Sequence, residues 1–539
     1  MYAAQNITPT VLDAMNGNVS EWYNECDNAI RRSEIVPGTY EYTTAISYGN
    51  VGEFGEGSST TVDIACDRFH IISIDNSFLY VEQDIEIKPS AKLSDKKGCN
   101  GIFYVGYQYA PEVFMGYKIY SNSDLVQTVT WANYEWFALR NSVQPQAREQ
   151  TDQYATIEKI RKLDPNVPGV YVDLSGQTAA AVTKVKLKLR VPLSSFLIFR
   201  FLRYLPNWAG KISIELTPSK NNLVIAPTQD PFTLTDTAGG AASIPFGKWC
   251  KDKVDLDFGF SNFNNEVNYY FSGTADNNTA WDPVKFTCEK FECKRIESRL
   301  AVYMLDPDIS NALAAKYIAV PLMFTIHQIS VKDFAGEVGN QSADPGARTD
   351  IALTTAMKHA DTMFVLFRRT INDYSCFYNP GIKYHINIDG KYYPREEYST
   401  VEDMRSYNLT LDAMNFNNNF TTTINPEMQS SIMPYVKVWT HTGGQKTQYT
   451  NGDRSNFWLG IPFADSEDFM GGISTVGTVQ IQYTGDRDGP DELKAKKFTK
   501  PIALFTEDAL LKIRSMKPAG APQIGITTAS IEQILAAGQ

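Results

Sequence analysis

The stretch that decides the fold is "FLRYLPNWAGKISIEL", residues Phe201–Leu216. Its first half is crowded with apolar and aromatic residues around a Pro-Asn break. After Gly210 the residues alternate, with Ile212, Ile214 and Leu216 on one side and polar residues on the other. Alternation with a period of two predicts a strand that is buried on one face only.

A similar arrangement recurs about half a chain later. "LRVPLSSF…GKISIELT" and "LGIPFADSEDF…GTVQIQYT" each contain a strand, a proline, an irregular crossing, a glycine and an alternating strand. The prolines, at 192 and 462, are 270 residues apart, and the glycines, at 210 and 477, are 267 residues apart. A strand and then an acidic helix start follow each copy, at 299–317 and 501–517. We therefore predict a duplicated all-β unit.

Strand-like runs also dominate the rest of the chain. They lie at 69–87, 183–193, 321–331, 363–369, 382–393 and 435–440. Asp389-Gly390 between two alternating runs predicts a two-residue hairpin. Helical patterns are few: 123–141, 507–517 and a last short helix that begins with a capping box at Ser530. The predicted fold class is all-β, with two tandem eight-stranded jelly-roll β-sandwiches and helices in loops and at the termini.

The predicted organisation has five parts. They are an N-terminal arm (1–42), jelly roll 1 (43–305), a linking helix (306–317), jelly roll 2 (318–506) and a C-terminal tail (507–539). Jelly roll 1 is roughly 65 residues longer than its counterpart between the glycine and the next strand, so we predict a surface insertion at about 229–284. We expect both ends of the chain to act as arms in an assembly.

Composition excludes some classes of protein. The chain has 539 residues and a net charge of −11, which disfavours a main task of gripping nucleic acid. Its seven cysteines are odd in number and scattered, as is typical of free thiols in a reducing compartment. The first residues lack a signal-peptide pattern, and the longest apolar run is shorter than the roughly 20 residues of a membrane span. We expect a soluble protein made inside the cell.

No residue of the sequence is a candidate for catalysis, cofactor binding or metal binding. The five histidines fit structural roles, and Cys288 and Cys293 lack the spacing of a zinc site. "KVKLKLR" sets Lys184, Lys186, Lys188 and Arg190 on one strand face. This face is either a solvated outer surface or a basic surface that contacts an acidic neighbour or the genome side of a shell.

The order of these stretches resembles the double jelly-roll major capsid proteins of eukaryotic DNA viruses. This lineage includes virophages, Polinton-like elements and large DNA viruses, and is hexon-like in fold. The likeness is carried by "VPLSSFLIFRFLRYLPNWAGKISIELTPSKNN", "RLAVYMLDPDISNALAAKY" and "IPFADSEDFMGGISTVGTVQIQYTGD".

The resemblance implies a structural protein with no enzymatic activity and no cofactor. It implies a homotrimeric, pseudo-hexagonal capsomer that tiles an icosahedral virion shell, made in the cytoplasm or nucleus of the infected host cell. Its partners would be copies of itself, neighbouring capsomers, and minor capsid, penton and cement proteins. Sequence-specific nucleic acid would not be among the partners, and contact with an internal membrane is left open.

Two other classes of protein remain as alternatives. A carbohydrate-binding or glycan-processing β-sandwich is compatible with the aromatic and acidic content, although an enzyme of this kind needs paired carboxylates about 5–10 Å apart. A secreted adhesin or lectin is disfavoured by the missing leader and the unpaired thiols.

Overall fold

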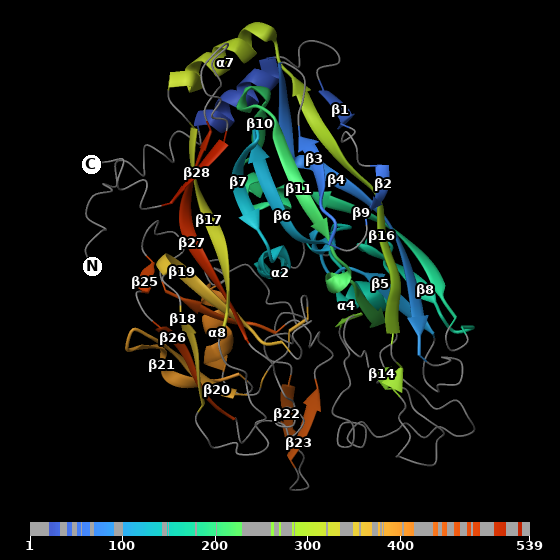
Figure 1. Ribbon diagram of the computed structural model, residues 1–539. Helices are drawn as coiled ribbons and strands as arrows, with labels where there is room; N and C mark the ends of the chain where they lie inside the picture. Colours follow the sequence, from blue (N-terminus) through green and yellow to red (C-terminus); the bar gives the residue numbers. More distant parts are fainter. Residues whose placement is uncertain are drawn as a thin grey trace.

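The chain forms two lobes, each a sandwich of two antiparallel sheets (Figure 1). The computed structural model describes residues 21–32, 40–45, 51–54, 57–64, 69–90, 101–142, 148, 150–177, 181–200, 202–228, 260–263, 269–270, 283–284, 286–319, 322–334, 349–354, 357–368, 376–377, 380, 382–400, 404–413, 435–439, 445–449, 457–463, 472–475, 478–485, 501–513 and 526–530.

Lobe one is built on two very long strands that pair with each other. Its first sheet has the order β1-β16-β4-β10, with β2 also paired to β16 and β9 paired to β4. Its facing sheet has the order β3-β11-β6-β7, and a smaller sheet at one end has the order β13-β12-β5-β8. The strands are β1 (Tyr40–Ala45), β2 (Val51–Phe54), β3 (Thr60–Ile64), β4 (His70–Pro89), β5 (Ile102–Gly106), β6 (Phe114–Ser121), β7 (Asp124–Val129), β8 (Gly169–Asp173), β9 (Thr183–Pro192), β10 (Tyr204–Pro206), β11 (Ile212–Pro218), β12 (Val224–Pro227), β13 (Ser261–Asn262) and β16 (Phe286–Met304).

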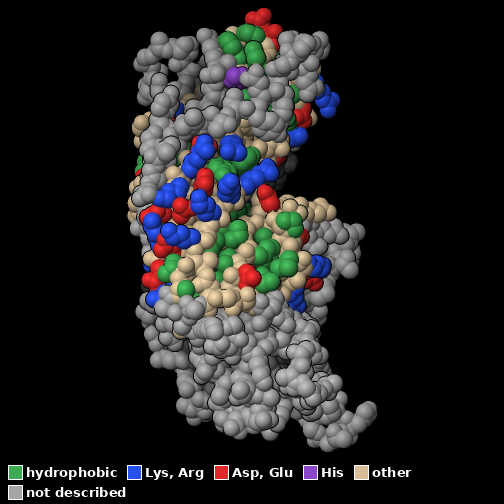
Figure 2. Space-filling view, turned by 90° about the vertical axis from the view of Figure 1, so that its right-hand side faces the viewer, with side chains coloured by type: hydrophobic (Ala, Val, Ile, Leu, Met, Phe, Trp, Pro, Cys, Tyr) green, Lys and Arg blue, Asp and Glu red, His purple; other side chains and the backbone are tan. Residues whose placement is uncertain are grey.

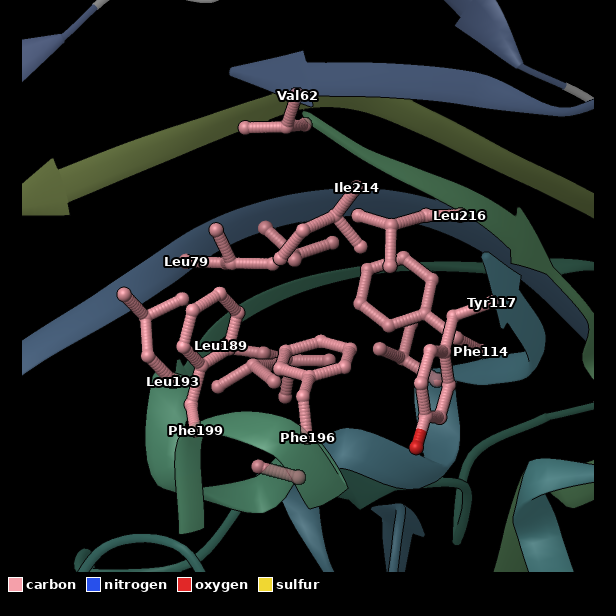
Figure 3. Packing of buried hydrophobic residues seen from close by; sticks show 14 of the residues in the cluster. Val62, Leu79, Phe114, Tyr117, Leu189, Leu193, Phe196, Phe199, Ile214 and Leu216 are labelled. Atoms are coloured by element: carbon pink, nitrogen blue, oxygen red, sulfur yellow. The ribbon is translucent and has the colours of Figure 1, made fainter. Parts of the chain in front are cut away.

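The core of lobe one lies between its two large sheets. The alternating residues of β11 behave as the sequence predicts, because Ile214 and Leu216 are fully buried (Figure 3). They face Leu79 of β4 and Leu189 of β9, and Phe196 closes the space from below. Burying a side chain of this kind contributes roughly 1.5–3 kcal/mol.

Lobe two repeats the sandwich. One sheet has the order β17-β27-β19-β24, with β25 and β28 added beside β19 and β27, and the other has the order β18-β26-β20-β21. The strands are β17 (Leu322–Asp333), β18 (Thr349–Thr354), β19 (Met357–Leu366), β20 (Ile382–Ile388), β21 (Lys391–Ser399), β24 (Leu459–Pro462), β25 (Ile473–Thr475), β26 (Thr478–Gly485), β27 (Ile502–Ile513) and β28 (Ile526–Ser530). Two small pairs complete the strands: β14 (Tyr269–Tyr270) with β15 (Pro283–Val284), and β22 (Tyr435–Trp439) with β23 (Gln445–Tyr449).

Both lobes have the same winding. If the eight main strands of each lobe are counted along the chain, each first sheet runs 1-8-3-6 and each facing sheet runs 2-7-4-5. This is the order of a jelly roll, in which two Greek keys close a sandwich. The predicted partners, β11 and β26, are both seventh strands, so the duplicated unit and the predicted fold class are confirmed.

Short helices connect the strands. They are η2 (Ala110–Val113), α2 (Ala132–Ser142), α4 (Ile157–Arg161), η3 (Leu193–Ser195), α5 (Leu197–Arg200), η4 (Asn207–Ala209), η5 (Lys220–Asn222), α7 (Pro307–Ala319) and α8 (Met404–Ala413). The helix predicted between the lobes is α7, and its start is capped by Asp306, whose carboxylate accepts from the backbone N–H of Asp308 at 2.9 Å.

The predicted hairpin at Asp389-Gly390 is confirmed. These two residues join β20 to β21, and both have positive φ angles, 48° and 84°. A two-residue turn of this handedness matches the twist of the strands it connects.

The helix predicted over 123–141 is wrong in its first half. Residues 124–129 form β7, which pairs with β6 through the turn Asn122-Ser123. Both turn residues have positive φ, 50° and 79°, so the chain makes a tight hairpin where the apolar spacing indicated a helix. The helix begins only at Ala132.

The helix predicted over 507–517 is also wrong as far as residue 513. Strand β27 continues through this segment and pairs with β17 along its whole length, from Ile502 to Ile513. Pairing of this extent outweighs local helix propensity. The strand therefore crosses the predicted boundary at 506 and 507. Ser530, the predicted cap of a last helix, ends β28, and the rest of that helix lies outside the described residues.

The predicted arm and insertion are described only in part. Residues 21–32 of the N-terminal arm form a helix, and β1 begins at residue 40. Most of the predicted insertion at 229–284 lies outside the described residues. Its described pieces include β13, β14 and β15.

Candidate functional site

Helix α2 connects the two lobes. It follows β7 of lobe one and lies between the two lobes (Figure 1). Phe137 on this helix packs on lobe two. The Phe137 ring lies edge-on to Phe377, with centroids 4.6 Å apart, and to Trp458 at 5.6 Å. All three side chains are 0–1% exposed. An aromatic cluster of this kind joins the lobes through a closed apolar contact.

Polar contacts surround this aromatic cluster. The guanidinium of Arg368 donates to the Tyr134 hydroxyl at 3.3 Å, and the amide of Gln108 donates to the sulfur of Cys376 at 3.6 Å. The thiol of Cys376 in turn donates to the backbone carbonyl of Phe260 at 3.5 Å. Each of these bonds spans more than a hundred residues, so the junction fixes one lobe against the other.

A buried ion pair lies beside the aromatic cluster on the same helix, where the guanidinium carbon of Arg140 is 4.8 Å from the Phe137 ring centroid. Nη1 of Arg140 donates to Oε1 of Glu112 at 2.8 Å, and the two side chains are 3% and 0% exposed. Burial raises the pKa of Glu112 to about 7, although the charge of Arg140 acts to lower it. Breaking such a pair leaves an uncompensated charge inside the protein, so the contact commits α2 to this position.

A second buried carboxyl lies on α2 itself. The Tyr117 hydroxyl is 3.1 and 3.2 Å from the two carboxyl oxygens of Glu135 and donates to them. Burial raises the pKa of Glu135 to about 8, against the lowering effects of the Tyr117 hydrogen bond and the charge of Arg200. Glu135 therefore keeps its proton to a higher pH than an exposed glutamate does.

At the far end of lobe one, the N-terminal helix over residues 21–32 docks on its own chain. Trp22 is fully buried and lies edge-on to Tyr317 of α7, at 5.1 Å between ring centroids, and to Trp208, at 5.7 Å. Trp208 and Tyr317 stack on each other at 5.7 Å. This aromatic trio joins the N-terminal helix, the linking helix and lobe one.

Ion pairs line the exposed side of that trio. Nζ of Lys316 contacts the carboxylates of Glu21, at 2.8 Å, and Glu25. The Tyr317 hydroxyl donates to Glu25 at 2.7 Å, and the Tyr204 hydroxyl donates to Asp27 at 2.7 Å. We infer that these pairs orient the helix, while the aromatic trio holds it.

Replacing Lys316 with alanine tests this division of roles. We expect a loss of less than about 1 kcal/mol in global stability, because the pair is partly exposed and screened by solvent. The backbone amides of residues 21–32 should nevertheless exchange faster with deuterium, because local opening of the helix becomes easier. Unchanged exchange over these residues would show that the ion pairs play no part in seating the helix.

The predicted basic face on β9 lies on the outside of lobe one. Lys184, Lys186, Lys188 and Arg190 are all exposed, and the residues between them are buried in the core. Figure 2 shows Lys and Arg side chains gathered with acidic ones across the middle of this side of the molecule.

Two arginines of this face lie on aromatic rings. The guanidinium carbon of Arg190 is 4.5 Å from the Phe78 ring centroid, and that of Arg299 is 4.3 Å from the Tyr80 centroid. Both rings belong to β4, between the strands that carry the arginines. Stacking of this kind fixes the guanidinium groups in place.

The histidine and cysteine side chains discussed above lie among other side chains of the fold. Nε2 of His385 is 2.8 Å from Oε1 of Gln482, and its ring packs on Tyr392 at 4.5 Å. Among the described residues, Cys26, Cys288, Cys293 and Cys376 form no disulfide bond. Among the described residues no cluster of metal-ligating side chains is found, and no helix is long and apolar enough to cross a membrane.

Comparison with known proteins places this geometry in a fold family. No family model matches the chain, and no curated protein matches its sequence. Among solved structures, the major capsid protein of mavirus matches with a TM-score of 0.50 and 11% identity, over 93% of this chain and 92% of that one. The chain has the double jelly-roll fold.

Two further solved structures match a similar share of this double jelly-roll chain. The Sputnik virophage structure matches at a TM-score of 0.48 and 10% identity, over 91% of this chain and 88% of that one. The capsid of the virus PBCV-1 matches at 0.39 and 10% identity, over 91% and 96%.

The sequence did not reveal the residues that join the two jelly rolls. Phe137 and Trp458 are 321 positions apart and no local pattern links them. Glu135 and Arg140 lie in a helical stretch where charged side chains normally point to solvent. A weak signal was present in the aromatic run "NYEWFAL", which is richer in large side chains than a one-sided helix needs.

Proposed function

We propose that the chain is a major capsid protein that forms a homotrimeric, pseudo-hexagonal capsomer and tiles an icosahedral virion shell. The observation that carries the proposal is the presence of two identically wound jelly rolls in one chain. The match to the mavirus major capsid protein over nearly the full length of both chains supports it.

The physical argument concerns symmetry. Three chains with two like lobes each give six similar walls around a threefold axis, so a near-sixfold tile forms from a threefold oligomer. Such a tile needs lobes that keep a fixed relative orientation, and the α2 junction supplies this. Permanent subunit interfaces commonly bury 2,000–5,000 Å² or more, an extent that the flat sides of two sandwiches can provide.

The proposal extends to partners and to the described ends of the insertion. The chain would pair with itself, with neighbouring capsomers and with minor capsid, penton and cement proteins, and would reside in the virion. β14 and β15 lie beyond the strands of lobe one at its lower end in Figure 1. Their position supports a protrusion formed by the 229–284 segment at that end.

Light scattering coupled to size-exclusion chromatography tests the trimer. We expect a species of about 180 kDa, three times the mass of the 60.4 kDa chain. Negative-stain images of that species should show particles with a hexagonal outline. A stable monomer would contradict the proposal, and a monomer that binds glycans would support the alternative of a carbohydrate-binding β-sandwich, which the structural matches do not favour.

A further inference from the structure

The outer face of lobe one carries two charged rows side by side. The exposed residues of β9 form a cationic row, and three outward residues of β4, Glu82, Asp84 and Glu86, form an anionic row. The register sets Lys184 opposite Glu86, Lys186 opposite Asp84 and Lys188 opposite Glu82. Neighbouring strands lie about 4.8 Å apart, so the two rows are a close, parallel pair of opposite sign.

Most of the charges in these two rows are not neutralised by an ion pair with another described residue. Of the three cross-strand pairs, Lys184 and Glu86 approach to 3.9 Å. Lys186, Lys188, Glu82 and Asp84 make no ion pair within 4 Å in the described part of the chain.

Two of the acids on β16, the next strand, are already paired. Glu292 contacts Lys290 and Lys294 at 2.8 Å each, and Glu297 contacts Arg295. Among the described residues, the charges of this face that make no ion pair thus lie mainly in the two rows on β9 and β4. We call them the paired rows, because a cationic row and an anionic row lie side by side.

We propose that the paired rows dock on the paired rows of a second copy of this chain. A twofold axis parallel to the strands, between β9 and β4, turns one face onto the other. Each cationic row then lies over the anionic row of the other copy. Such a contact is self-complementary, with the same patch on both partners.

The charge pattern favours a second copy of this chain over nucleic acid as the partner. A nucleic-acid backbone would meet the anionic row of β4 and be repelled by it, whereas a second copy offers the complementary order of charge. A twofold contact cannot close a threefold ring, because the ring needs two different patches on each subunit. The contact therefore connects one trimer with another, which makes it rest on the proposed function.

The size of the face indicates a weak contact. Seven residues of β9 span about 23 Å, and two rows cover far less than the roughly 800 Å² per partner of a standard stable interface. Exposed ion pairs of this kind are also screened by salt over about 8 Å. Many copies acting together in a shell would make such contacts effective, and a single pair of trimers would separate readily.

Charge reversal on each row tests the proposal. We expect Lys186→Glu with Lys188→Glu to weaken association between trimers at least tenfold, because two anionic rows then face each other. Glu82→Lys with Asp84→Lys should do the same with two cationic rows. Equal mixing of the two variants should restore association, because each variant then supplies the row that the other lacks.

The measurement is sedimentation velocity at about 50 mM and about 500 mM salt, after light scattering has established the subunit count of each variant. A variant with Lys162→Glu and Lys391→Glu, two exposed lysines away from the face, is the control and should associate as the natural chain does. Association that survives both reversals, or that mixing fails to restore, would overturn the docking. A chain that is not trimeric overturns the proposed function instead, and the mixing result still decides whether the faces pair.

Discussion

We expect Phe137→Ala to lower the free energy of unfolding by about 3–5 kcal/mol and to make the two lobes melt separately. The Phe137 ring fills the contact with Phe377 and Trp458, and its removal leaves a cavity between the lobes. Because the aromatic cluster lies in the apolar contact between the lobes, its loss weakens the coupling between lobes more than the packing within either one. The effect should therefore appear in cooperativity as well as in stability.

Differential scanning calorimetry measures both quantities. The matched control is Phe103→Ala, which removes an equally buried ring from within lobe one, where Phe103 packs on Phe286. Phe103→Ala should lower the transition temperature and leave the pattern of transitions unchanged. A single transition at the natural temperature in Phe137→Ala would show that α2 does not couple the lobes.

The second large effect is a fall in stability as pH rises from about 4.5 to about 8. The unfolded chain ionises Glu135 near the ordinary value of 4.5, whereas the folded chain holds the proton up to a pKa of about 8. Between these values the folded state carries more protons, so each step up in pH favours unfolding. The stabilising contribution is complete below pH 4.5 and is lost by about pH 8, at roughly 1 kcal/mol for each pH unit. Glu112 acts in the same direction up to about pH 7.

Urea unfolding of Glu135→Gln at several pH values checks this origin. Glutamine keeps the shape of the neutral acid and an oxygen for the Tyr117 hydroxyl. The variant should resemble the natural chain near pH 4.5 and become more stable than it toward pH 8. Glu158→Gln, on the exposed side of α4, removes a carboxyl at the surface and should keep the natural pH dependence. Parallel curves for Glu135→Gln and the natural chain would refute the assignment.

Local patterns predicted the fold because each lobe repeats them. The alternation after Gly210 and after residue 477 marks the seventh strand in both lobes, where apolar residues on one sheet face are buried in the core and polar residues lie on the other. Period and turn chemistry are properties of short stretches, so they can be read without a structure. The same logic failed at 507–513, where the full-length pairing with β17 decides the conformation.

The lobe junction could not be predicted in this way. Glu135 is buried because lobe one and lobe two both pack on α2. This packing depends on how the two lobes are arranged, which no local stretch of sequence reveals. The paired rows could be predicted from the sequence only in part. The lysines of β9 were visible as an outward row, but their position beside the acids of β4 depends on a strand register that only the structure supplies.

The docked N-terminal helix has a consequence for synthesis on the ribosome. Glu21 and its partner Lys316 are separated by 295 residues, and β1 pairs with the last strand of lobe one. At about 5–20 residues per second, roughly 15–60 s pass between translation of the helix and translation of the surface that receives it. During that interval Trp22 lacks its contact with Tyr317, so the helix that carries Trp22 is fully covered only after the linking helix has been made. Nascent chains halted before residue 317 should therefore be the ones that chaperones retain.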